Sequence, residues 1–178
     1  MHEMARKLKL FIAMSLYGYI TDRLEGLDFL NTVAQKGEDY GYTAFNQTVD
    51  TVIMGRKTYD TVLAMGVGYP HKDKTSYIIT RQPAQGKEKL HFYSGSLKAL
   101  VEDLRSKPGK DIYCDGGAEI VNALLMEKLF DELIVSVIPV LLGGGVRLFT
   151  KEYPEQSLKL LGAKSFDKGL VQLHYQVL

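Results

Sequence analysis

The chain of 178 residues has no tryptophan and only one cysteine, Cys114. A single cysteine excludes an internal disulfide framework and any multi-cysteine metal site, and it fits a reducing compartment. Cys114 falls in an apolar run without a nearby histidine, so we expect it to pack as a small hydrophobic residue. The four histidines are dispersed and lack metal-ligand spacing, and we therefore expect no bound metal.

Excess charge and long apolar runs are also missing. The formal net charge is +1, which gives no electrostatic footprint for nucleic acid or for an anionic membrane surface. The apolar run 10–16 is too short to span a bilayer and is not followed by a small-residue cleavage site. We expect a cytoplasmic protein whose partner is a small molecule.

Repeats, low-complexity tracts and linker-like changes of composition are absent, which predicts one domain over residues 1–178. Short apolar runs alternate with amphipathic stretches, and the turn sequence Asp167-Lys168-Gly169 joins the last two apolar segments. The pattern predicts an α/β fold with a mostly parallel sheet and a C-terminal antiparallel hairpin. We expect strands at 8–14, 51–55, 77–79, 90–93, 112–114, 133–140, 158–163 and 170–178, and helices at 38–48 and after Gly55, Ser96 and Gly117.

A buried strand ending at Gly55 is followed at once by Arg56, Lys57, Thr58 and a helical pattern. A helix start directs free backbone N–H groups and the positive end of its dipole toward one point, where a phosphate is a natural ligand. The two cations and the threonine hydroxyl strengthen such a site. A plain strand–helix turn with solvated cations explains the same spacing equally well.

Three further features follow strands of the predicted sheet: Thr80-Arg81, the segment from Asp115 to Glu119, and the loop 15–26 with its large side chains. The carboxyl ends of parallel strands are where ligands bind in such sheets, so these features converge on one site. The loop carries Tyr17, Tyr19 and Ile20, which either fold back onto the core or cover a ligand. The pair Gly116-Gly117 does not form the Gly-x-Gly-x-x-Gly fingerprint of dinucleotide-binding proteins, and the sequence contains no Walker P-loop.

The stretch Val52-Ile53-Met54-Gly55-Arg56-Lys57-Thr58-Tyr59 resembles the first cofactor-phosphate loop of dihydrofolate reductases, and 114–119 resembles the double-glycine loop of that fold. The segment 131–149, with Leu142-Gly143-Gly144-Gly145, resembles the riboflavin-biosynthesis reductase branch and its small stand-alone bacterial relatives. The resemblance covers nearly the whole chain. It implies a three-layer dihydrofolate-reductase-like fold and NADPH as the cofactor.

Carried over by position, the resemblance implies phosphate contacts from Gly55, Arg56, Lys57 and Thr58. It places Thr80 and Arg81 near the adenine ribose and its 2′-phosphate, and Ala13 and Ile20 beside the nicotinamide. The pyrophosphate would meet Gly116, Gly117, Ala118 and Glu119.

The proton donor is harder to assign. Dihydrofolate reductases carry a tryptophan in the first long loop, which this chain lacks, and an acid on the next helix. Counting back from Gly55 places Asp39 at that acid position, and Asp28 is the rival if the helix lies earlier. In an apolar pocket Asp39 would have a raised pKa and donate a proton, whereas a first-turn acid would only complement a helix dipole.

The resulting interpretation is an NADPH-dependent reductase that transfers a hydride to a small heterocyclic or imine-type substrate, similar to 5-amino-6-(5-phosphoribosylamino)uracil reductase. Dihydrofolate reduction is an alternative, and a non-catalytic NADP(H)-binding or sensing module is another. We expect a homodimer, with 133–140 and the last strand as the interface.

Overall fold

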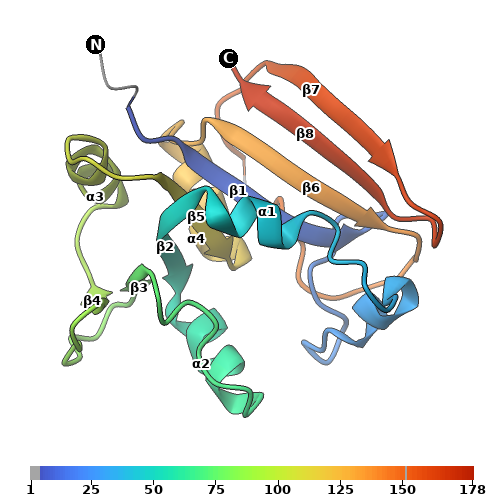
Figure 1. Ribbon diagram of the computed structural model, residues 1–178, viewed down its shortest axis with the longest axis horizontal. Coiled ribbons are helices and arrows are strands. Elements are labelled where there is room, and N and C mark those ends of the chain that lie inside the picture. The colour runs from blue at the N-terminus through green and yellow to red at the C-terminus, as the bar shows by residue number, and fades with distance from the viewer. Residues whose placement is uncertain (1–4, 151) are drawn as a thin grey trace.

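An eight-stranded mixed sheet, in the order β4-β3-β2-β5-β1-β6-β8-β7, runs through the computed structural model, which describes residues 5–150 and 152–178 (Figure 1). The strands are β1 (Leu8–Ser15), β2 (Val49–Gly55), β3 (Thr75–Ile79), β4 (Leu90–Tyr93), β5 (Asp111–Gly116), β6 (Glu132–Ile138), β7 (Leu158–Ser165) and β8 (Val171–Val177). All pairs from β4 to β6 are parallel, whereas β8 pairs antiparallel with both β6 and β7. The predicted fold class is confirmed.

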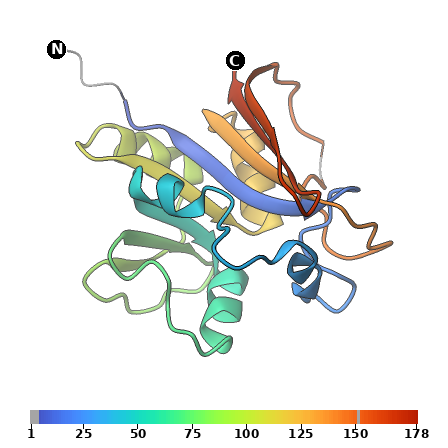
Figure 2. The same cartoon turned by 45° about the vertical axis from the view of Figure 1, so that its right-hand side comes forward.

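Helices cover both faces of the sheet and make three layers (Figures 1 and 2). On one face, α3 (Leu97–Arg105) and α4 (Ala118–Met126) pack their apolar stripes on β1, β2 and β5. On the other face, α1 (Tyr42–Gln47) packs Phe45 on the central strands, and α2 (Arg56–Ala64) contributes Tyr59. A short 3₁₀ helix, η1 (Asp28–Val33), packs against Ile138 and Leu170.

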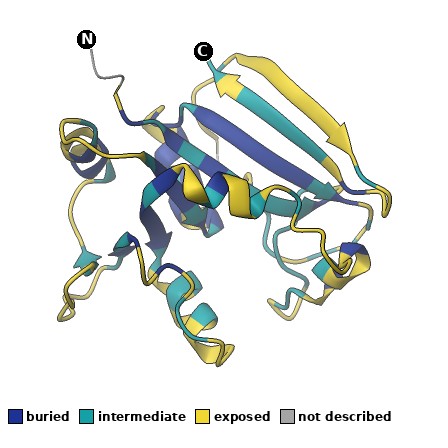
Figure 3. Ribbon diagram, in the orientation of Figure 1, coloured by how far each residue is buried: buried dark blue, intermediate teal, exposed yellow. Residues whose placement is uncertain are grey.

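The central strands are apolar on both faces because both faces are covered. Val52, Ile53 and Met54 of β2 are completely buried, as is Cys114 of β5. Figure 3 shows this buried centre and, in contrast, the exposed edge strand β7. Cys114 packs as the sequence predicted, and burial raises the pKa of its thiol to about 12, so it is no nucleophile.

Several local predictions are wrong. The helix expected over 38–48 begins only at Tyr42, because Gly41 adopts a left-handed conformation with φ +82° and Glu38 and Asp39 precede the helix. Strand β6, expected at an interface, lies inside the sheet between β1 and β8, with most of its side chains buried. His71, in the connection between α2 and β3, is buried, with 1% exposure.

The parallel strands β1, β2, β3 and β5 run in the same direction and end at the same edge of the sheet (Figure 1). Their last residues are Ser15, Gly55, Ile79 and Gly116. Each is followed by a segment singled out in the sequence. Within the described residues, no helix is both long enough and apolar enough to cross a membrane.

Candidate active site

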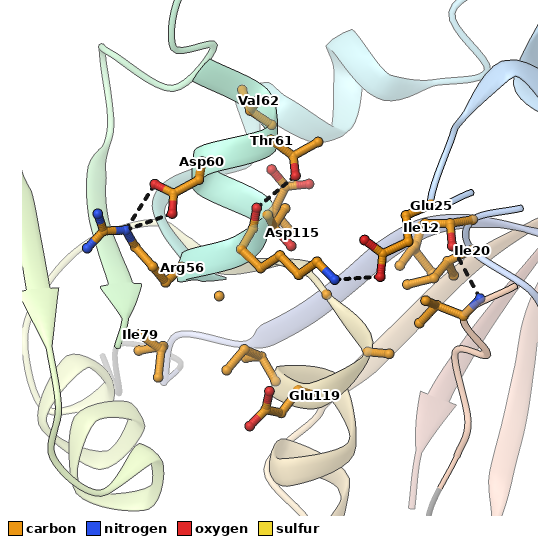
Figure 4. A pocket seen from close by; sticks show the side chains of 18 of the residues that line it. Ile12, Ile20, Glu25, Arg56, Asp60, Thr61, Val62, Ile79, Asp115 and Glu119 are labelled. Carbon is orange, nitrogen blue, oxygen red and sulfur yellow. Dashed lines mark hydrogen bonds and ion pairs between the residues drawn. The ribbon is translucent and has the colours of Figure 1, made fainter. Parts of the chain in front are cut away.

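An open cleft of about 1660 Å³ lies at this edge of the sheet (Figure 4). The loop after β1, both helices that follow β2 and β5, and the segment after β3 all contribute to its walls. Its volume exceeds the few hundred to roughly 1,000 Å³ that is usual for a single drug-sized ligand. The cleft therefore has room for a ligand as large as a dinucleotide beside a second small molecule.

The starts of α2 and α4 meet in this cleft. A Cβ atom on Gly55 would lie 3.2 Å from Ile120 and 3.8 Å from the backbone nitrogen of Gly117. A Cβ atom on Gly117 would lie 3.1 Å from the Thr58 hydroxyl. Glycine at both positions thus permits the close approach of the two helix starts, and Gly116, with φ +103°, is in a conformation that side chains disfavour.

Neither helix is capped by a side chain. The N-cap residues are Gly55 for α2 and Gly117 for α4, and neither carries a group that accepts a first-turn N–H. Helix α3, by contrast, is capped in the ordinary way, because the Ser96 hydroxyl accepts a hydrogen bond from Ala99 N at 3.2 Å. Two sets of helix N–H donors therefore remain available for an anionic ligand in the cleft.

Every cation predicted to bind phosphate is paired with a carboxylate. Lys57 Nζ lies 2.5 Å from Glu25 Oε1, Arg56 Nε lies 2.9 Å from Asp60 Oδ1, and Arg81 Nη2 lies 3.0 Å from Glu119 Oε1 (Figure 4 shows the first two). All three pairs are substantially exposed, and exposed ion pairs contribute little to stability. A phosphate can replace these carboxylates at small cost, so the pairs hold the cations in place without blocking the site.

Asp115, near the end of β5, also lines the cleft. Unlike the other carboxylates of the lining, it is held by two buried neighbours. The Tyr113 hydroxyl donates to Asp115 Oδ1 at 2.8 Å, and His71 Nε2 lies 2.9 Å from Asp115 Oδ2. Burial, together with the charge of Asp115, raises the pKa of Tyr113 well above its ordinary value, so the phenol keeps its proton and donates. Each carboxylate oxygen retains a lone pair for a ligand N–H.

Part of the cleft wall is apolar. Phe11, Ile12 and Ala13 of β1 line it together with Leu27 and Leu30. Ile20 also lines the cleft, whereas Tyr17 and Tyr19 of the same loop contact the Arg147 guanidinium, whose carbon lies 4.2 and 5.6 Å from the two ring centroids. The loop is thus held against the segment before Leu148, and only part of it faces the cleft.

The sequence matches the family described as the RibD C-terminal domain over residues 6–172. The chain belongs to this family. An uncharacterized protein of Bacillus subtilis (strain 168), YwjB, is 42% identical over 97% of this chain and 98% of its own length. The crystal structure of a putative riboflavin biosynthesis protein from Shewanella sp. PV-4 is 32% identical, covers 97% of this chain and 99% of its own, and superposes with a TM-score of 0.88.

A dihydrofolate reductase from Enterococcus faecalis, complexed with NADP(H), shares the fold. It is 15% identical, covers 96% of both chains and superposes with a TM-score of 0.64. The resemblance read from the sequence, to the dihydrofolate-reductase-like superfamily and its riboflavin-biosynthesis branch, is confirmed by membership of the RibD C-terminal domain family.

In this member of the RibD C-terminal domain family, the residues predicted to bind the cofactor lie together. Of that set, all except Gly116 line the cleft: Ala13, Ile20, Gly55, Arg56, Lys57, Thr58, Thr80, Arg81, Gly117, Ala118 and Glu119. Their contact with a cofactor remains a prediction.

The predicted acids lie elsewhere. Asp39 and Asp28 are exposed, and neither lines the cleft. Asp39 accepts hydrogen bonds from the backbone N–H groups of Gly41 and Thr43, at 2.9 Å each. Together with the Thr43 side chain, these bonds lower the pKa of Asp39, so the expectation of a raised pKa is wrong. Asp39 instead binds backbone N–H groups at the start of the short helix α1.

Sequence reasoning did not predict that Asp115 of the cleft wall is held by His71, which lies behind it. Asp115 was visible as the last acid before the glycine pair, at the end of a strand, and that position is a usable signal. No sequence signal marks His71, because it lies in the long connection between α2 and β3 and reaches Asp115 only through the tertiary fold.

Proposed function

We propose that the protein is an NADPH-dependent reductase that transfers a hydride to a small heterocyclic or imine-type substrate. The observation that carries this proposal is the convergence of two uncapped helix starts and three cations on one cleft, whose walls also include apolar side chains and Asp115. The two adjacent helix starts suit the pyrophosphate of a dinucleotide, and Arg81 adds a cation for the further phosphate that NADPH carries on its ribose.

The residues present fit NADPH. Thr58, Lys57 and Arg56 at the start of α2, and the N–H groups of Gly117 and Ala118 at the start of α4, would hold the phosphates. Arg81, whose side chain is 92% exposed beside the cleft, would bind the 2′-phosphate through two N–H groups. Ala13 and Ile20 would border the nicotinamide, which supplies the hydride when the cofactor is bound.

The remaining groups orient the substrate and exclude water. The apolar wall of Phe11, Ile12 and Leu30 would pack on a flat heterocycle. Asp115 would accept an N–H of the substrate with its free lone pairs, and this contact would place the reducible bond beside the nicotinamide. The carboxylate is the group in this wall that can hold or pass a proton during reduction.

A pyrimidine-type substrate is favoured over dihydrofolate. The Shewanella relative is described as a putative riboflavin biosynthesis protein, and this chain is more similar to it than to the dihydrofolate reductase of E. faecalis. The test is oxidation of NADPH with 5-amino-6-(5-phosphoribosylamino)uracil or with dihydrofolate. Faster turnover of the pyrimidine supports this assignment, faster turnover of dihydrofolate supports the alternative, and background rates with both refute each of these two substrates.

A non-catalytic NADP(H)-binding module is the alternative of another class. It is favoured by the position of Asp28 and Asp39, since the acids expected from the resemblance lie outside the cleft. Binding of NADPH without its oxidation across a broad panel of imines and heterocycles would support the sensor. Absence of NADPH binding would refute both functions.

We propose in addition that the protein is a cytoplasmic homodimer. A single cysteine fits a reducing compartment. All eight residues of the edge strand β7 are exposed, and Leu158, Leu160 and Leu161 are each more than two-fifths exposed. An apolar edge strand of this kind is typical of an interface, because unpaired strand edges otherwise promote aggregation.

A further inference from the structure

His71 is buried beside the cleft although it lies in an irregular segment between α2 and β3. Its ring is 1% exposed and is packed edge to face against two tyrosine rings, with centroid distances of 5.5 Å to Tyr69 and 5.8 Å to Tyr113. The segment is tied down nearby, because Lys74 N donates to His71 O at 3.0 Å and the Tyr69 hydroxyl donates to Ser76 Oγ at 2.8 Å. The imidazole therefore has one defined position.

The two ring nitrogens of His71 have different surroundings. Nε2 lies 2.9 Å from Asp115 Oδ2, whereas Nδ1 is buried and has no hydrogen-bond partner among the described residues. A buried N–H without an acceptor is costly, and a carboxylate accepts but does not donate when ionised. The arrangement favours the tautomer in which Nε2 carries the proton and donates to Asp115.

We propose that His71 is a positioning residue that, together with Tyr113, orients the Asp115 carboxylate toward the N–H groups of a heterocyclic substrate. This proposal deepens and rests on the proposed reductase function. The two donors engage different oxygens of Asp115, Tyr113 on Oδ1 and His71 on Oδ2, so they determine the plane of the carboxylate. The Asp115 side chain keeps 23% exposure toward the cleft, which leaves it accessible to a ligand.

A purely structural role explains less. A leucine or phenylalanine would fill the same space between Tyr69 and Tyr113 without burying an unpaired ring nitrogen. Burying Nδ1 without a partner costs free energy, and the contact of Nε2 with Asp115, which lines the cleft, gives a reason for a histidine at this position.

The variants His71→Leu and His71→Gln separate the two roles. Leucine fills the space but cannot donate, whereas glutamine places an amide N–H near the position of Nε2. The matched controls are His174→Leu and His174→Gln, because His174 Nε2 contacts the Glu132 carboxylate at 2.7 Å and lies outside the cleft lining. The probe is 6-aminouracil, which carries an amino N–H and a ring N–H side by side.

Binding of 6-aminouracil is followed by NMR with and without NADPH. We expect His71→Leu to weaken the probe about tenfold, and His71→Gln to stay within about threefold of the native protein, because a hydrogen bond to a charged group is lost in the first and kept in the second. Both His174 variants bind the probe as the native protein does. NADPH affinity is unchanged in all four variants.

A second measurement does not depend on any ligand or on the folding of a variant. Nitrogen-15 NMR of the native protein reports the tautomer of each histidine, and we expect His71 to carry its proton on Nε2. A proton on Nδ1 overturns the proposal, as does unchanged probe affinity in His71→Leu or failure of the native protein to bind 6-aminouracil. Loss of NADPH binding in the native protein would refute the proposed function separately, since the probe and tautomer are also measured without NADPH.

Discussion

Lys57 Nζ and Glu25 Oε1 lie 2.5 Å apart and join the loop after β1 to the start of α2. The ammonium group that we propose for a cofactor phosphate is thus held by a carboxylate from the loop that also carries Ile20, which lines the cleft. A bound phosphate competes with Glu25 for the same cation. The pair couples the position of the loop to occupation of the cleft.

Glu25→Gln removes this competitor. We expect it to tighten NADPH binding by about two- to fivefold at low salt, because an exposed ion pair contributes up to about 1 kcal/mol. The difference should shrink at high ionic strength, as salt screens exposed charges. Calorimetric titration measures the affinity, and Glu127→Gln, an exposed change outside the cleft lining, is the control. Weaker NADPH binding in Glu25→Gln would show that the carboxylate itself contacts the cofactor favourably.

The surroundings of Glu132 lead us to expect that the stability of the fold decreases at acidic pH. It is buried, and Lys7 Nζ and His174 Nε2 each lie 2.7 Å from one of its oxygens. Burial alone would raise its pKa, but these hydrogen bonds and the nearby charge of Lys9 outweigh burial and lower the pKa below the ordinary 4.5. A lowered folded-state pKa contributes stability above pH of about 4.5, and that contribution is lost as pH falls through the folded-state pKa.

Denaturant midpoints measured at neutral and acidic pH check this point. The native protein should lose stability below pH of about 4.5, and Glu132→Gln should be less stable at neutral pH and lose less on acidification. Glu127→Gln should behave as the native protein does. If Glu132→Gln keeps the whole pH dependence, other carboxylates determine it.

The exposed apolar side chains of the edge strand β7 lead us to expect a homodimer. We expect light scattering to give twice the chain mass of 20.0 kDa. Leu160→Lys should convert the protein to a monomer, because Leu160 is 54% exposed on β7 and a buried lysine without a partner is costly at an apolar interface. Val67→Lys, at a residue 83% exposed in the segment after α2, should leave the dimer intact. A native monomer would contradict the dimer.

Much of the fold could be predicted because its signals are local. The strand ending at Gly55 and the strand before Gly116-Gly117 are apolar runs stopped by glycine, and parallel strands place such ends at one edge. This logic predicts that Thr58, Arg81 and Ala118 lie close together, and all three line the cleft.

The contacts of the carboxylate in the cleft wall could not be predicted in this way. Counting back from Gly55 places Asp39 at the acid position, but the left-handed Gly41 delays the helix to Tyr42, and Asp39 does not line the cleft. His71 contacts Asp115 across 44 positions of sequence, and no local pattern marks a contact of that kind. Tertiary packing, rather than periodicity, decides which polar groups face the cleft.

The most direct test of the reductase assignment is titration of the native protein and Arg81→Ala with NADPH and with NADH. Arg81 should recognise the 2′-phosphate, which NADH lacks, so the substitution should weaken NADPH by about ten- to a hundredfold and NADH by less than about twofold. The freed Glu119 carboxylate also repels a 2′-phosphate, so the ratio of the two losses reports recognition of the 2′-phosphate at the Arg81–Glu119 pair. Lys98→Ala, at an exposed position on α3, is the charge-matched control. Equal weakening of both dinucleotides, or failure of the native protein to bind NADPH, would contradict the assignment.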